Sequence, residues 1–186
     1  MPADAPRAHD GGWIRRASRR IFDSGWFRLR RDDLTLPNGD EIVYTVIEHD
    51  GWVLVVPLLD DGRVVMERVF RHPLQRTSLE CPSGGRDGEP PEQAARRELE
   101  EETGYTGGEW THLGRFAASS GLSSEEFDVF VCRGPRPEGR IERENTEQIE
   151  VELIEFAALV EQAKRGEIGD APSALAILLA EARFGR

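Results

Sequence analysis

The sequence has few cysteines, and they form no recognisable motif. Cys81 and Cys132 lie far apart in the chain and belong to no CxxC pair. A small protein that depends on disulfides carries many more cysteines at regular spacings. We therefore expect two buried free thiols and a reducing compartment.

Long apolar runs and an excess of positive charge are also missing. No stretch approaches the roughly 20 apolar residues of a membrane-spanning helix, and no apolar segment typical of a secretory signal is visible. The net charge of -11 at pH 7 argues against a stable nucleic-acid partner, because binding a polyanion requires positive charge. We expect a cytoplasmic protein with no membrane partner. A phosphate-bearing small ligand remains compatible, since metal ions can supply positive charge.

The positive charge that is present gathers near the N-terminus. Residues 1–31 contain eight arginines and three aspartates. Apolar residues recur at helical spacing in residues 13–22, so residues 1–24 are predicted to form an arm that contains a basic amphipathic helix. Such a helix could contact a membrane or an RNA. Packing against its own protein or a sister subunit is the favoured interpretation.

The chain of 186 residues is long enough for one domain with an extra element. Strand-like runs flank Asn38-Gly39, a strong hairpin signal, so residues 25–49 are predicted to form an antiparallel strand lobe. Residues 50–186 are predicted to form the main domain. Its strands surround one helix that ends at Gly104, and two further helices close the chain. The expected fold is α+β, a mixed sheet flanked by helices.

Four glutamates crowd the second half of the first helix, in the stretch RELEEETGY. Successive residues of an α-helix are rotated by about 100°, which brings Glu98, Glu101 and Glu102 onto one arc and turns Glu100 toward solvent. An acidic surface face is the plain interpretation, but like charges repel on such a face. Carboxylate oxygens are the ligands that Mg²⁺ and Mn²⁺ prefer. We expect these three glutamates to hold divalent cations, braced by Arg97.

From Glu89 to Tyr105 the sequence resembles the Nudix box, G-x5-E-x7-R-E-U-x-E-E-x-G-U, in which U is bulky and apolar. The first glycine of the box falls on Ser83, and the nearest glycine is Gly84. Either Ser83 replaces the glycine or the loop is one residue short. The resemblance implies that a backbone carbonyl, assigned to Ser83, joins the three glutamates as a metal ligand. Glu89 is either a further ligand or a partner of Arg97.

The resemblance also implies a fold and a set of catalytic residues. The fold is the Nudix α/β/α sandwich, preceded by the antiparallel lobe. The reaction would use two or three Mg²⁺ or Mn²⁺ ions, held by the three glutamates beside Arg97. A general base would come from the acidic loop ENTEQIEV, where Glu147 matches best and Glu144 and Glu150 are close competitors.

Outside the box, the chain resembles the branch that cleaves ADP-ribose and nucleoside-diphosphate sugars. That resemblance implies substrate contacts from Arg71 on the strand before the loop, from Gly84 in the loop and from Glu125 in the stretch ASSGLSSEEF. It also implies a homodimer formed through the N-terminal lobe, from which Arg28 and Arg30 would reach phosphates. Ordinary surface ion pairs remain the alternative for these arginines.

These matches imply divalent-metal-dependent hydrolysis of the pyrophosphate bond in a nucleoside diphosphate linked to another group. ADP-ribose or a related nucleotide sugar would give a nucleoside monophosphate and a sugar phosphate. Ser120 stands where ADP-ribose-specific members usually have proline. Two other functions stay open: a domain that binds a nucleotide sugar without cutting it, and an enzyme acting on RNA 5′ ends through the basic arm.

Overall fold

A computed structural model describes the chain apart from its ends and two short segments, that is, residues 7–8, 11–143 and 148–185. Contacts divide the chain into two compact units. The N-terminal unit comprises Met1–Asp50 and Ala117–Glu126, and the main unit comprises Gly51–Phe116 and Phe127–Arg186.

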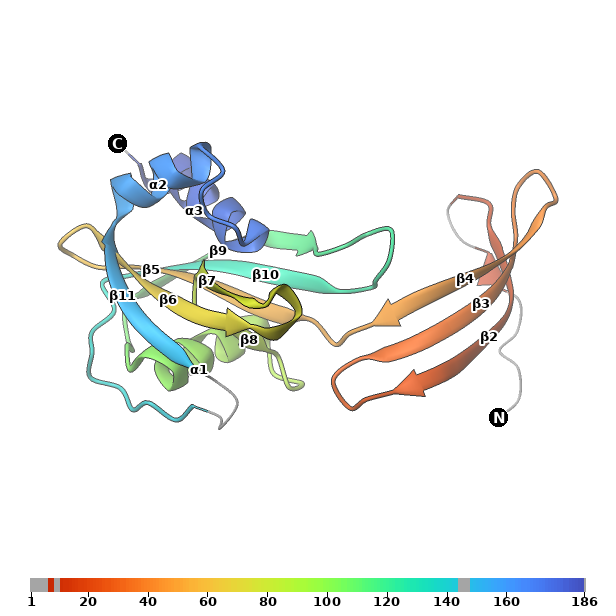
Figure 1. Cartoon of the computed structure of the whole chain (residues 1–186), viewed down its shortest axis with the longest axis horizontal. Helices are drawn as coiled ribbons and strands as arrows, with labels where there is room; N and C mark the ends of the chain where they lie inside the picture. Colours follow the sequence, from red (N-terminus) through yellow and green to blue (C-terminus); the bar gives the residue numbers. More distant parts are fainter. Residues whose placement is uncertain (1–6, 9–10, 144–147, 186) are drawn as a thin grey trace. The chain divides into compact units, whose positions relative to one another are not determined.

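The N-terminal unit is an antiparallel sheet of strand order β1-β2-β3-β4 (Figure 1). Between β3 and β4, Gly39 has a φ of 90°, which glycine adopts at little cost. The Leu36 N–H donates to the Asp40 carbonyl at 2.8 Å. The hairpin predicted at Asn38-Gly39 is therefore confirmed. The strands are β1 (Arg7–Ala8), β2 (Ile14–Asp23), β3 (Arg28–Thr35) and β4 (Glu41–Glu48).

The helix predicted in the N-terminal arm is wrong, because these residues form the strand β2. The register of β2 on β3 shifts twice, between Arg15 and Ala17 and between Arg20 and Phe22. A bulge adds one residue to a strand and interrupts the alternation of side chains between its two faces. The apolar residues of β2 therefore recur at an interval that resembles the period of a helix.

The main unit is built on a mixed sheet of strand order β11-β6-β5-β10-β9, in which β7 also pairs with β6 and β8 with β5. β10 runs parallel to β5, whereas β6 and β8 pair with β5 in the antiparallel sense. The strands are β5 (Trp52–Leu58), β6 (Arg63–Arg71), β7 (Arg76–Glu80), β8 (Ser83–Gly85), β9 (Glu109–Ala117), β10 (Glu126–Arg133) and β11 (Ile149–Glu155).

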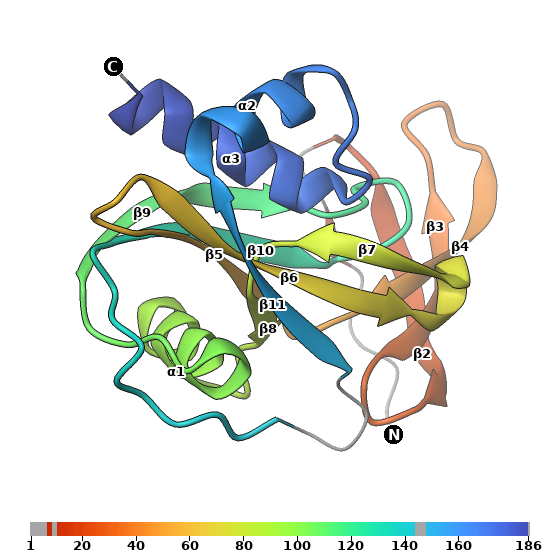
Figure 2. The ribbon, with the colours of Figure 1, turned by 60° about the vertical axis from the view of Figure 1, so that its left-hand side comes forward.

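Helices cover both faces of this sheet, with α1 on one side and α2 and α3 on the other (Figure 2). Side chains of β5 alternate between two apolar cores, since Val53 and Val55 pack toward α1 while Leu54 and Val56 pack toward α2 and α3. A strand buried on both faces reads as a continuous apolar run. The predicted α+β sandwich is confirmed. The helices are α1 (Pro91–Thr103), α2 (Phe156–Lys164) and α3 (Ala171–Phe184), with a 3-10 turn at His72–Leu74.

Both cysteines are free and fully buried, as the sequence predicted. Burial disfavours the thiolate, so the pKa of the Cys81 thiol is raised strongly and that of the Cys132 thiol is raised to about 12. Neither thiol therefore has the character of a nucleophile. Among the described residues, no helix is long and apolar enough to cross a membrane.

Candidate active site

The acidic helix α1 directs two of its glutamates into the protein. The side chains of Glu98 and Glu102 face the short strand β8, and the two residues are only 7% and 6% exposed. The backbone N–H of Ser83 donates to the Glu102 Oε2 at 2.9 Å. A carboxylate is costly to bury without partners, so a solvated acidic face does not describe these two residues.

Gly84 makes room for the Glu98 carboxylate. A Cβ atom at this position would lie 2.2 Å from the Glu98 Cδ and 2.3 Å from its Oε2, so any side chain would displace the carboxylate. The loop to Glu89 has one residue fewer than the box spacing counted from Gly84. Of the two alignments left open by the sequence, a loop one residue short fits this packing, because glycine is needed at 84 and not at 83.

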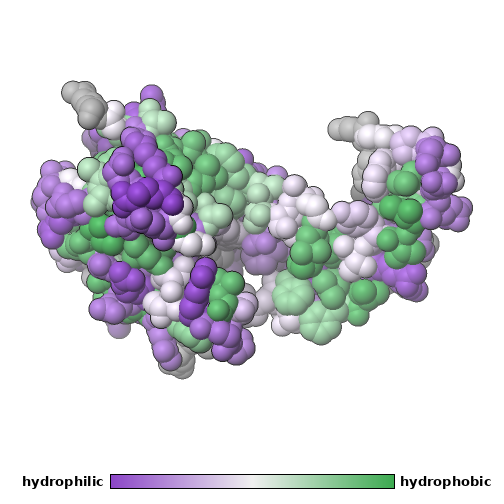
Figure 3. All heavy atoms as spheres, turned by 45° about the horizontal axis from the view of Figure 1, so that its top comes forward, coloured by the Kyte–Doolittle hydropathy of each residue, from purple (hydrophilic) through white to green (hydrophobic). Residues whose placement is uncertain are grey.

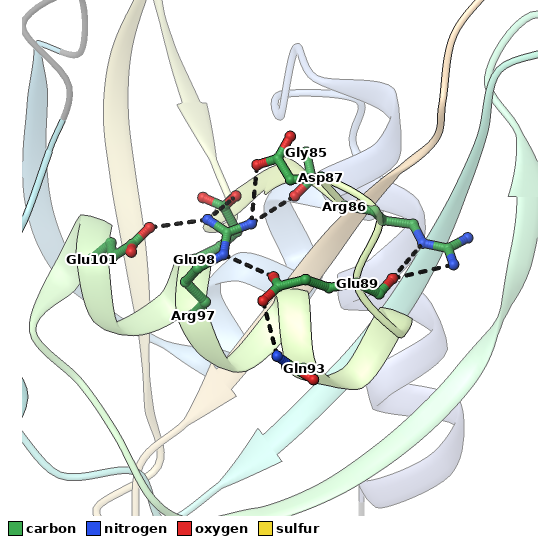
Figure 4. A network of polar contacts seen from close by, with 8 residues as sticks. All are labelled: Gly85, Arg86, Asp87, Glu89, Gln93, Arg97, Glu98 and Glu101. Atoms are coloured by element: carbon green, nitrogen blue, oxygen red, sulfur yellow. Dashed lines mark hydrogen bonds and ion pairs between the residues drawn. The ribbon is translucent and has the colours of Figure 1, made fainter.

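Arg97 joins the helix to the loop that precedes it (Figure 4). Its guanidinium donates to the Glu89 Oε2 at 2.9 Å, to the Gly85 carbonyl at 2.9 Å and to the Glu101 Oε2 at 3.0 Å, and it pairs with the Glu98 Oε1 at 2.8 Å. Burial disfavours its charge, but these carboxylates outweigh burial and raise the pKa of Arg97. Of the two roles considered for Glu89, the structure supports that of Arg97 partner.

The donor set of α1 fits a hard divalent cation. Glu98 and Glu102 are buried oxygen donors beside a backbone cradle that only glycine leaves open, and Glu101 lies one third exposed at its edge. Within the described residues, no three Asp, Glu, His or Cys side chains are arranged to hold a metal as they stand. In the structure, Arg97 contacts both Glu98 and Glu101 (Figure 4). Each contact uses one carboxylate oxygen, Oε1 of Glu98 and Oε2 of Glu101, so the other oxygen of each side chain could bind a cation.

The sequence analysis did not single out a neighbouring pair of buried carboxylates. Glu67 on β6 and Glu80 on β7 are cross-strand partners and are 1% and 6% exposed. Glu80 accepts from the Arg71 Nε at 3.1 Å and from its terminal nitrogen at 2.6 Å, which raises the pKa of Arg71. Glu67 interrupts the apolar stretch of β6, and that interruption was the available signal. Arg71 thus forms an ion pair, which the sequence analysis gave as the alternative to a substrate contact.

The other predicted substrate residues lie in the N-terminal unit. Arg28 pairs with Asp50, and Arg30 pairs with Asp32 and Glu48. Both arginines are therefore paired with acidic residues of the same unit.

Glu125 and Glu147 complete the predicted set. Glu125 follows the tight turn at residues 119–123, and its carbonyl accepts from the Ala118 N–H at 3.0 Å. Glu147 and its competitor Glu144 lie outside the described residues, whereas Glu150 lies on β11 and is exposed.

Two protein-family models match the chain. A NUDIX domain matches residues 49–175, and a nucleoside diphosphate sugar hydrolase N-terminal domain matches residues 13–47. The first match contains α1 with its preceding loop, and the second contains strands β2 to β4 up to Ile47.

Individual proteins are similar over most of their length. An ADP-ribose pyrophosphatase of Bacillus subtilis (strain 168) is 36% identical over 163 residues, covering 87% of this chain and 88% of the relative. An ADP-ribose pyrophosphatase of Mycobacterium tuberculosis is 34% identical over 155 residues, covering 82% and 75%. A crystal structure of an ADP compounds hydrolase shares the fold, with a TM-score of 0.80, 20% identity and full coverage of both chains. The chain therefore belongs to the Nudix family.

Proposed function

We propose that this protein hydrolyses the pyrophosphate bond of a nucleoside diphosphate joined to a sugar, releasing a nucleoside monophosphate and a sugar phosphate. The observation that carries the proposal is the burial of Glu98 and Glu102 against Gly84 and β8. Burying two carboxylates on one helix face lowers the stability of the fold. A role in binding cations accounts for their burial despite this loss.

Nudix hydrolases generally use divalent metals, and we assign Mg²⁺ or Mn²⁺ to this site. Glu98, Glu101, Glu102 and the carbonyl of Ser83 would hold two or three ions. Bound ions would neutralise charge on the phosphate oxygens and activate the attacking water. Arg97 holds the loop Gly85–Glu89 against α1 and so fixes the helix face relative to β8.

The substrate assignment draws on the relatives. Two of them, named above, are ADP-ribose pyrophosphatases, and a GDP-mannose pyrophosphatase of Citrobacter koseri is 28% identical over 84% of this chain. ADP-ribose or a related nucleotide sugar is the substrate that we propose. Arg71, Gly84, Glu125, Arg28 and Arg30 are proposed to contact it, the arginines through its phosphates.

Two further parts of the proposal concern the base and the assembly. Glu147, outside the described residues, is proposed to accept the proton of the attacking water. The protein is proposed to be a cytoplasmic homodimer. The N-terminal unit is proposed to form the interface, because it exposes large apolar side chains at its surface (Figure 3).

The experiment compares Glu102→Gln with the wild type on ADP-ribose, ADP-glucose, GDP-mannose, NADH and diadenosine polyphosphates. We expect the wild type to release a nucleoside monophosphate with Mg²⁺ or Mn²⁺ and to stop when EDTA is added. Glutamine keeps an oxygen to accept the Ser83 N–H but removes the charge. Turnover should therefore fall by about a hundredfold or more, the scale of losing one preorganised group that stabilises charge in the transition state.

The control is Glu92→Gln, the same change at an exposed position of α1. Among the contacts described, the Glu92 side chain pairs only with Arg96. This variant should keep wild-type turnover. Full turnover in Glu102→Gln would refute the metal assignment. Tight nucleotide-sugar binding without hydrolysis in the wild type would replace the enzyme by a binding domain.

A further inference from the structure

The last turn of α1 is closed by a segment from elsewhere in the chain. A helix leaves its final carbonyls without partners of its own. Here the Glu142 N–H donates to the Glu101 carbonyl at 2.9 Å, and the Arg143 Nε donates to the Glu102 carbonyl at 2.7 Å. The Gly139 N–H also donates to the Gly104 carbonyl at 2.9 Å. The turn that carries two proposed metal ligands is thus held by residues 139–143.

Arg143 makes a second bond that leads away from the helix. Its terminal nitrogen donates to the carbonyl of Ile149, the first residue of β11, at 2.8 Å. Figure 2 shows the chain passing from β10 around α1 before it enters β11. One guanidinium therefore connects the end of α1 to the beginning of β11.

Arginine suits this position for two reasons. Its planar fork can donate to two carbonyls in fixed directions, whereas a lysine ammonium acts as a point charge on a flexible stem. A cation at the C-terminus of a helix is also favourable. Within α1, which is described in full, the last turn carries no basic side chain, so Arg143 supplies that charge from outside.

We propose that Arg143 is a positioning residue for the metal site. It holds the backbone of Glu102 in place and ties that turn to β11, without touching substrate or metal. The proposal rests on the proposed function for its catalytic part. The connection between α1 and β11 stands independently of that function.

The test uses Arg143→Gln and the conservative Arg143→Lys in the full chain. The control is Arg140→Gln, since the Arg140 side chain is 84% exposed and pairs with Glu142, while its backbone contact to Glu100 would survive the change. Three quantities are measured: hydrogen exchange by mass spectrometry in peptides covering α1 and β11, Mn²⁺ affinity by calorimetry, and kcat and KM with ADP-ribose.

We expect Arg143→Gln to exchange faster at the end of α1 and the start of β11 only. It should bind Mn²⁺ about tenfold more weakly, the typical effect of losing a partner that orients a metal ligand. Its kcat should fall by a similar factor of about ten while KM changes little. Arg143→Lys should recover part of each effect, and Arg140→Gln should match the wild type.

Other results would overturn the proposal. Unchanged exchange in both variants would show that Arg143 does not connect α1 to β11, whatever the kinetics. Faster exchange with unchanged Mn²⁺ affinity would leave it a helix cap with no role at the metal site. Uniformly faster exchange throughout the chain would show that Arg143 stabilises the whole fold and has no specific role at the metal site. Exchange and Mn²⁺ binding need no turnover, so an inactive wild type would refute the proposed function alone.

Discussion

At the scale of single residues, the site depends on Gly84, a position where a side chain is not tolerated. Gly84 adopts no left-handed conformation, so its requirement for glycine is not conformational. It comes from the space that the Glu98 carboxylate occupies. A pattern of residue types cannot reveal such a requirement, because it depends on two segments that meet only after folding.

Replacing Gly84 by alanine should damage the site. The new Cβ would overlap the Glu98 carboxylate, and forcing a side chain into a packed site costs about 1–3 kcal/mol. The carboxylate would move from its cradle, so kcat should fall by about tenfold or more. Activity assays measure the fall in kcat, and urea unfolding measures the loss of stability.

The neighbouring Gly85→Ala is the matched control. Its Cβ would lie 3.4 Å from the Asp87 Oδ1, an ordinary contact that an exposed side chain can accommodate. Equal losses in the two variants would contradict the steric role assigned to Gly84.

At the scale of elements, the start of α3 is fixed by contacts that reach beyond the helix, as is the end of α1. Asp170 caps α3, since its Oδ2 accepts from the Ser173 N–H at 2.9 Å and from the Ser173 hydroxyl at 2.6 Å. The same hydroxyl oxygen accepts from the buried Cys81 N–H at 2.9 Å. The cap therefore joins α3 to the chain between β7 and β8.

Asp170→Ala should lower the free energy of unfolding by about 0.5–2 kcal/mol, the usual cost of losing an N-cap. The value should lie toward the upper limit, because Ser173 also loses a partner in the interior. Urea denaturation measures the loss, and turnover per folded molecule should not change. Asp170→Asn keeps an acceptor oxygen and should retain most of the stability. If Asp170→Asn lost as much stability as Asp170→Ala, the capping role of Asp170 would be wrong.

At the scale of the whole molecule, the N-terminal unit exposes several large apolar side chains, and contiguous exposed apolar patches mark interaction surfaces. Trp26 is 77% exposed, the largest value among the exposed large apolar residues described. Other exposed large apolar residues of this unit are Ile14, Ile21, Phe22, Phe27, Val43 and Leu122. The proposed homodimer would cover part of this surface.

Trp26→Glu should weaken that dimer. A buried interfacial tryptophan typically contributes about 2 kcal/mol or more, so the dissociation constant should rise by about thirtyfold or more. Sedimentation velocity over a range of concentrations measures the shift. Leu74→Glu in the main unit, where the side chain is 56% exposed, is the matched control. A wild type that sediments as a monomer of 20.9 kDa would refute the dimer.

Local sequence patterns predicted the structure correctly where a single local signal determined it. Asn38-Gly39 predicted a hairpin, and Gly104 predicted the end of α1, because each turn requires a conformation that few residues adopt. The pattern failed at residues 14–23, where apolar spacing resembled a helix. There the partner strand β3 and two bulges decided the structure, and neither is encoded by the periodicity of β2 alone.

The sequence by itself determined that Glu98, Glu101 and Glu102 share one face of a helix, because the pitch of a helix depends only on local backbone geometry. Only the tertiary structure decided that Glu98 lies against Gly84, that Arg97 binds Glu89, and that Arg143 connects the last turn of α1 to β11. These contacts join segments distant in the chain. Their geometry follows from how the sheet brings those segments together.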